Sequence, residues 1–185
     1  MAITDEFVYV PALDARANDV SAKLAALVEE GILKRSALGG RILDIGSGYG
    51  GSYKALSRYS PDVIGIEPKK ELVEQLIRHG IIDKNKIFAT DALQFLKGQP
   101  DTSYDFICAL HLFNNGYGLD VERVHEQAFR TLRKGGQILY TAEMDTSSGP
   151  NFSRRLEELA GKNTATLIRD FRVGPDNVVY VQTKV

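Results

Sequence analysis

Residues suited to binding a charged ligand gather in one short run of the chain. Asp44 precedes glycines at positions 46, 48, 50 and 51, and Ser47 lies between the first two of them. Glycine allows positive φ angles and a close approach of the backbone to a ligand. A helix expected directly after the run would point free N–H groups into the same space, which suits an anionic group. Four glycines in six positions are more than one turn needs, so the run predicts a binding loop.

Two ligand classes fit the glycine spacing. Gly46, Gly48 and Gly51 satisfy the Gly-x-Gly-x-x-Gly pattern of dinucleotide-binding loops, which is a weak signal by itself. Counted from Asp44, the run instead reads Asp-x-Gly-x-Gly-x-Gly and ends at Gly50. A carboxylate two residues before the first glycine suits a cationic amino acid and not a diphosphate. Asp44 therefore favours the second spacing.

Acids also end the two strands expected next along the chain. Glu67 follows Gly65 and Ile66 at a strand end, where a carboxylate can accept hydrogen bonds from both hydroxyls of a ribose. This feature is common to NAD and other adenosine ligands, so it does not choose between them. Pro68 offers a rigid apolar surface to an adenine ring, or it only begins the following helix. Asp91 closes the next strand and is suited to be the N-cap of a short helix.

In this ordered set of motifs the chain resembles the class I S-adenosylmethionine-dependent methyltransferases. The resemblance covers about residues 41–185 and includes the run Leu132-Arg133-Lys134-Gly135-Gly136 before a fifth strand. It implies S-adenosyl-L-methionine as the cofactor, with the methionine carboxylate at the glycine loop, the ribose on Glu67 and the adenine amino group on Asp91. The cofactor-binding residues that it implies are Asp44, Gly46, Ser47, Gly48, Gly50, Glu67, Pro68, Asp91, Ala92 and Leu110.

The methyl acceptor would meet the residues after the fourth strand, and His111 is the candidate catalytic residue there. His111 would act as a base or orient the acceptor, or it would only line the cofactor pocket. The implied reaction is in-line displacement at the sulfonium methyl, for which positioning supplies roughly 7–11 kcal/mol, so a base is optional. The run Ala-Leu-His-Leu at 109–112 lacks the Asn/Asp-Pro-Pro-Tyr/Phe pattern of many nitrogen-methylating members. His125 shares a helical face with apolar residues and is expected to pack.

The elements that would position these residues alternate between strand and helix, which is typical of an α/β fold with a parallel sheet. The short connection at 174–177 predicts a hairpin, so one of the last two strands should run antiparallel. We expect a Rossmann-like three-layer sandwich with a seven-stranded, mostly parallel sheet and a C-terminal antiparallel hairpin strand. The expected strands are 41–45, 63–66, 86–89, 105–110, 137–141, 164–173 and 178–184, and the main helices are 14–30, 68–80, 120–132 and 152–160.

A chain of 185 residues suits one domain. We expect an N-terminal helical segment at 1–40, a cofactor-binding core at 41–142, and a loop, helix and closing hairpin at 143–185. Cys108 is the only cysteine, so neither a disulfide nor a metal site is expected, and it should pack as a small hydrophobe. No apolar run approaches the ~20 residues that span a bilayer, which predicts a cytoplasmic protein without a membrane partner.

Four functions agree with these features. A methyltransferase acting on a small molecule is favoured, since a net charge of −1 makes nucleic acid a poor first guess for a partner. A methyltransferase acting on RNA or protein is the second, supported by a modest basic bias in the C-terminal part. A non-catalytic, cofactor-binding partner subunit and an NAD-binding oxidoreductase domain are the others. The sequence specifies neither the acceptor nor the oligomeric state.

Overall fold

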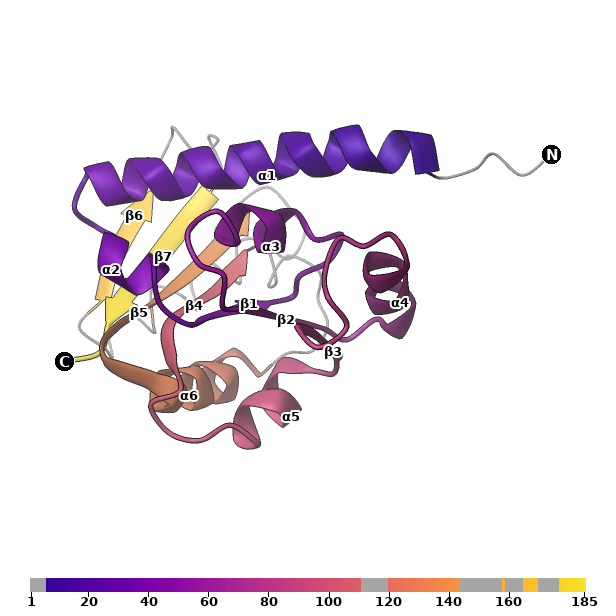
Figure 1. Ribbon diagram of the computed structural model, residues 1–185. Coiled ribbons are helices and arrows are strands. Elements are labelled where there is room, and N and C mark those ends of the chain that lie inside the picture. The colour runs from indigo at the N-terminus through magenta and orange to yellow at the C-terminus, as the bar shows by residue number, and fades with distance from the viewer. Residues whose placement is uncertain (1–5, 111–119, 144–157, 159–164, 170–176) are drawn as a thin grey trace.

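Seven strands form one sheet, in the order β3-β2-β1-β4-β5-β7-β6, in the computed structural model (Figure 1). The structure describes residues 6–110, 120–143, 158, 165–169 and 177–185. The strands are β1 (Ile42–Ile45), β2 (Val63–Glu67), β3 (Ile87–Ala89), β4 (Tyr104–Leu110), β5 (Leu132–Glu143), β6 (Ala165–Arg169) and β7 (Asn177–Thr183).

The pairing of the strands confirms the predicted fold class. β1 pairs in parallel with β2 and β4, and the pairs β2–β3 and β4–β5 are also parallel. β7 runs antiparallel to both β5 and β6, so one of the last two strands is reversed, as the short connection predicts. The carboxyl ends of β1, β2, β3 and β4 therefore lie at one edge of the sheet, where ligands of open α/β sheets bind.

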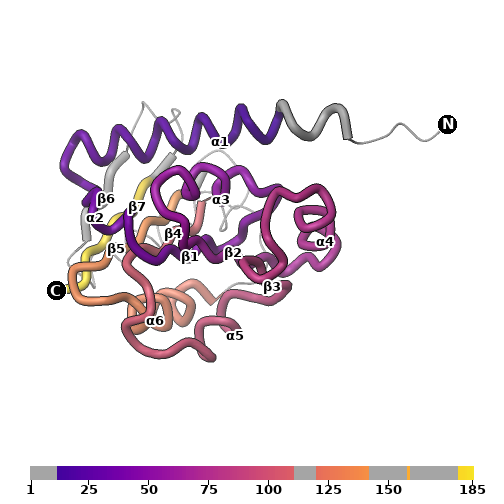
Figure 2. The backbone as a smooth tube through the Cα atoms, viewed as in Figure 1, coloured from indigo at the N-terminus to yellow at the C-terminus, as the bar shows by residue number. Residues whose placement is uncertain are grey.

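Helices cover both faces of the sheet, and α1 lies on the opposite side from the pair α5 and α6 (Figure 2). One apolar cluster joins the first three helices to one face, and a second joins α5 and α6 to the other. No helix within the described ranges combines the length and the apolar character that crossing a bilayer requires. The helices are α1 (Glu6–Glu29), α2 (Arg35–Leu38), α3 (Gly51–Leu56), α4 (Lys70–Arg78), α5 (Ala92–Lys97) and α6 (Val121–Thr131).

Three elements begin two or more residues away from the predicted start. α1 begins at Glu6 and not near Asp14, whereas the apolar pattern used to predict it starts only at Val20. α4 begins after Lys69, which is extended at φ −80 and ψ 102, so Pro68 is not its first residue. β5 extends from position 132 and contains a register shift against β4. The helix expected at 152–160 lies, except for position 158, outside the described residues.

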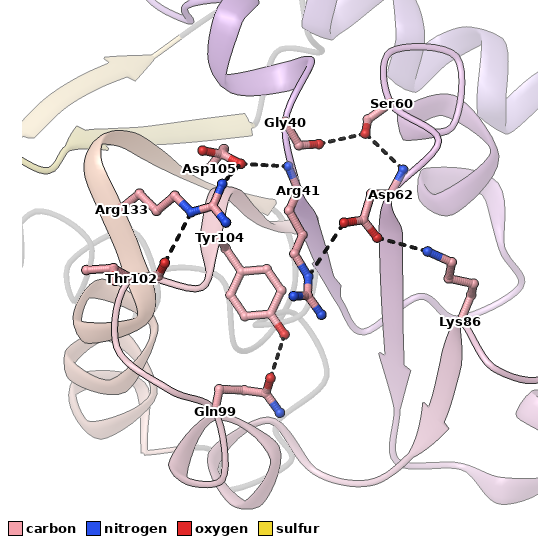
Figure 3. A network of polar contacts seen from close by, with 10 residues as sticks. All are labelled: Gly40, Arg41, Ser60, Asp62, Lys86, Gln99, Thr102, Tyr104, Asp105 and Arg133. Atoms are coloured by element: carbon pink, nitrogen blue, oxygen red, sulfur yellow. Dashed lines mark hydrogen bonds and ion pairs between the residues drawn. The ribbon is translucent and has the colours of Figure 1, made fainter.

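A polar network fastens the amino-terminal ends of β1, β2 and β4 at the edge opposite the glycine loop (Figure 3). Asp105 Oδ2 accepts from the backbone N–H of Arg41 at 2.7 Å and from Arg133 Nη1 at 2.8 Å. Asp62 Oδ1 pairs with Lys86 Nζ at 2.9 Å. These contacts hold the start of β1, at the end of the strand away from the glycine loop.

Candidate functional site

The glycine loop joins β1 to α3 with a left-handed backbone at alternate positions. The φ angles of Gly46, Gly48 and Gly50 are 76°, 50° and 86°, which residues with a Cβ rarely adopt. Gly51 is instead the first residue of α3, with no positive φ. The three left-handed glycines match the spacing counted from Asp44, and the third glycine of the dinucleotide spacing does not share their conformation.

The loop rests on the end of β2. The backbone N–H groups of Gly46 and Ser47 both donate to the carbonyl of Ile66, at 2.8 and 3.0 Å. A Cβ on Gly65 would stand only 2.5 Å from Ser47 Oγ, so glycine inside this strand lets the loop approach. This role of Gly65 was not predicted from the sequence, although a glycine inside a strand does signal a close approach of another segment.

Asp44 lies beneath the loop and is 0% exposed. Its Oδ2 accepts from Ser52 Oγ of α3 at 2.7 Å, and its Oδ1 contacts Cys108 Sγ of β4 at 3.5 Å. Burial raises the pKa of Asp44 from 3.8 to about 6, against the opposing effect of the hydrogen bond from Ser52. Both oxygens therefore face protein groups, and Asp44 ties β1 to α3 and β4 under the loop.

Glu67 ends β2, and its carboxylate is bonded both to the glycine loop and to the residue that precedes α4. Its Oε2 accepts from the backbone N–H of Gly48 at 3.1 Å, and its Oε1 accepts from that of Lys69 at 3.0 Å. Its carbonyl accepts from the backbone N–H of Thr90, after β3, at 3.2 Å. The tips of β1, β2 and β3 thus meet at Glu67, and the carboxylate keeps further lone pairs for a ligand.

Asp91 is the N-cap of α5, which confirms that prediction. Its Oδ1 accepts from the backbone N–H of Gln94 at 2.8 Å, and the side chain is exposed beside the tip of β2. Ala92 is buried as the first residue of α5, and Pro68 is exposed at the tip of β2. The adenine contact of Asp91 stays a prediction.

Leu110 ends β4 half-buried, on the face that α1 covers. It borders an apolar hollow between α1 and the sheet, together with Leu24 of α1 and Leu139 and Thr141 of β5. His111, the candidate catalytic residue, follows directly in the sequence but lies outside the described residues.

Two other ionisable side chains, those of His125 and Cys108, are buried in the protein core. His125 is 4% exposed among Phe129, Tyr140 and Tyr180, which confirms that it packs, and burial lowers its pKa to about 4. Burial also raises the pKa of the Cys108 thiol well above its usual value, so the thiol stays neutral. Over the part of the chain that the structure describes, no three His, Cys, Asp or Glu side chains are grouped to hold a metal ion.

The part of the chain that makes these contacts is similar in sequence to known proteins. A family model described as a methyltransferase domain matches residues 43–140, which include the glycine loop and both strand-end acids. The sarcosine/dimethylglycine N-methyltransferase of Aphanothece halophytica is 28% identical over 125 residues, which are 64% of this chain and 43% of that protein. The chain therefore spans less than half the length of this curated relative.

Solved structures share the fold. A provisionally assigned S-adenosyl-L-methionine-dependent methyltransferase of Methanococcus maripaludis superposes with a TM-score of 0.65 at 16% identity, covering 94% of this chain and 87% of that one. The YcgJ protein of Bacillus subtilis superposes with a TM-score of 0.50 at 25% identity, covering 68% of this chain and 55% of the other. The likeness at 16% identity concerns the fold alone.

Proposed function

The chain belongs to the class I S-adenosylmethionine-dependent methyltransferase family, and from that premise we propose that it transfers a methyl group from S-adenosyl-L-methionine to a small-molecule acceptor. One observation carries the proposal, the hydrogen bond from Gly48 to Glu67. It brings the glycine loop and the strand-end acid to one point, next to the tip of β3. Three consecutive strand ends then offer one continuous surface to an adenosine-bearing ligand.

The residues at this edge fit such a cofactor. The loop has glycine wherever a side chain would require a strained backbone, so its main chain is open to close approach. Glu67 holds its carboxylate still through two backbone N–H groups and would accept the ribose hydroxyls on its remaining lone pairs. Asp91 and Ala92 would border the adenine, with Pro68 against its ring. When bound, the cofactor supplies an activated methyl carbon on its sulfonium.

The contribution of the chain to the reaction is mainly positional. Asp44 and Ser52 fix the loop to α3, and the loop is fixed to β2 through Ile66, so the two ends of the cofactor site cannot move independently. Holding donor and acceptor in line can supply roughly 7–11 kcal/mol of the barrier reduction. His111, which follows Leu110 at the end of β4, is our candidate for orienting or deprotonating the acceptor.

A small acceptor is favoured over a macromolecule by two observations. The net charge of −1 offers no overall attraction to a polyanion. The curated relative is named for two small amino acids, sarcosine and dimethylglycine. We therefore propose small amines as the first acceptors to test, and the cytosol as the location.

Calorimetry of the purified chain with S-adenosylhomocysteine and with NADH tests the cofactor. We expect S-adenosylhomocysteine to bind and NADH not to bind, whereas binding of NADH alone would refute the proposal. Transfer from radiolabelled S-adenosyl-L-methionine to a panel of small amines, RNA and protein then tests the acceptor. Label in the small amines supports the proposal, label in RNA or protein refutes its acceptor class, and binding without any transfer indicates a cofactor-binding subunit.

A further inference from the structure

Arg16 of α1 lies across the point where the glycine loop meets α3. Its Cγ, Cδ and Cβ atoms are 2.8, 3.1 and 3.2 Å from the position that a Cβ on Gly51 would take. Because Gly51 has no side chain, the stem of Arg16 can rest directly on the backbone there. Arg16 lies outside the segment 43–140 that the family model matches, so the match says nothing about it.

Arg16 differs from the other cations between α1 and α3. Lys54 forms an ion pair with Asp14, and Arg58 donates to Asn18 and to a neighbouring serine. Arg16 is exposed and makes no hydrogen bond or ion pair with any residue in the described ranges. A guanidinium carries five N–H donors in a planar fork, so the group is available for a ligand.

The charges around the loop show what that ligand group should be. Asp44 and Glu67 place two carboxyl groups under and beside the loop, and these favour an ammonium group and disfavour a carboxylate. The cofactor of the proposed function ends in an amino acid that carries both groups. Its carboxylate needs a cation, and Arg16, whose stem rests on Gly51, carries a guanidinium that can supply a two-pronged hydrogen bond to it.

Building on the proposed function, we propose that Arg16 binds the carboxylate of the cofactor's amino-acid part. Arg16 then orients this zwitterionic end by holding its carboxylate toward α1. The first helix thereby becomes part of the cofactor site in addition to covering the sheet.

The test compares two ligands of the full chain by calorimetry. S-adenosylhomocysteine carries the amino-acid part, and 5′-methylthioadenosine lacks it. Arg16→Met keeps an apolar stem over Gly51 without the charge, Arg16→Lys keeps a charge without the fork, and Arg35→Ala removes an exposed arginine of α2 as the charge-matched control. For Arg16→Met we expect about tenfold weaker binding of S-adenosylhomocysteine and unchanged binding of 5′-methylthioadenosine.

Arg16→Lys should lose less than Arg16→Met, and Arg35→Ala should bind both ligands as the wild type does. Unchanged affinity of Arg16→Met for S-adenosylhomocysteine would overturn the assignment of Arg16 alone. An equal loss for both ligands would also overturn it, because the effect would then not depend on the carboxylate. If the wild type binds neither ligand, the proposed function fails and the role of Arg16 fails with it.

Discussion

The backbone N–H of Gly48 donates to Oε2 of Glu67 over 3.1 Å, so the glycine loop after β1 is bonded to the last residue of β2. The other oxygen of the same carboxylate accepts from Lys69 at 3.0 Å. The carboxylate cannot turn without breaking one of these bonds. A ligand that uses Glu67 therefore finds the acceptor already oriented, which reduces the ordering cost of binding.

Glu67→Gln should weaken the binding of both S-adenosylhomocysteine and 5′-methylthioadenosine by roughly 10–100-fold in calorimetry. Both ligands carry the ribose, and the amide replaces one of the two accepting oxygens by an N–H₂ group. That group would also face one of the two backbone N–H groups, of Gly48 or Lys69. Glu71→Gln, in the first turn of α4, is the control and should bind normally. Unchanged affinity of Glu67→Gln would remove Glu67 from the site.

The alternation of apolar runs and glycine-rich turns was sufficient to predict the sheet and its reversed strand. It did not predict that β7 inserts between β5 and β6, because the apolar pattern of a strand does not specify which strands it pairs with. It also placed the start of α4 at Pro68. In the structure the backbone N–H of Lys69 donates to the side chain of Glu67, two residues before it, and α4 begins at Lys70.

Those parts of the site that depend on the spacing of residues along the chain could be predicted from the sequence. The left-handed glycines and the acids at strand ends depend on local backbone geometry, so their spacing is informative. The partners of Asp44 are Ser52 and Cys108, which come from two other elements, and no local pattern connects them. Arg16 was missed for the same reason, because its importance depends on α1 crossing Gly51.

His111→Ala should lower methyl transfer to the acceptor found in the panel by roughly 10²–10⁴-fold if the imidazole acts as a base. The affinity for S-adenosylhomocysteine should then change little, because the cofactor contacts lie on the loop and on Glu67. His79→Ala, at the end of α4, is the matched control for loss of a histidine. A loss of cofactor affinity with no separate loss of turnover would show that His111 only lines the pocket.

Asp44→Asn should change how stability depends on pH. The pKa of Asp44 is raised from 3.8 to about 6 in the folded state. Between pH 3.8 and pH 6 the folded protein therefore keeps a proton on Asp44 that the unfolded chain has released. This contribution is complete below about pH 3.8 and is lost as the pH rises through about 6. In urea unfolding, the unfolding free energy of Asp44→Asn relative to wild type should rise by about 2 kcal/mol between pH 4 and pH 7. A difference in unfolding free energy that does not change with pH would contradict a raised pKa for the buried carboxyl of Asp44.

His125→Phe tests the opposite pH dependence. Burial among Phe129, Tyr140 and Tyr180 lowers the pKa of His125 to about 4, whereas the unfolded chain takes up the proton near 6.5. The unfolded state therefore gains protons first, and wild-type stability should fall by about 3 kcal/mol as the pH falls from about 7 to 4. Phenylalanine keeps the ring contacts without the titration, so its unfolding free energy should lack this part of the decline. An equal acid sensitivity of both proteins would exclude His125 as its source.

Gly40→Ala should destabilise the fold without touching the cofactor site. A Cβ at position 40 would lie 2.3 Å from Asp105 Oδ2, the oxygen that binds the backbone of Arg41 and the side chain of Arg133. Displacing this carboxylate should cost roughly 2–3 kcal/mol in urea unfolding. Gly39→Ala is the neighbouring control, because its nearest atom is the Arg35 carbonyl at 3.7 Å and its φ is −82°, so it should be neutral or slightly stabilising. Because the network lies at the opposite edge of the sheet, folded Gly40→Ala should bind S-adenosylhomocysteine like the wild type, and weakened binding would show that the two edges are coupled through β1.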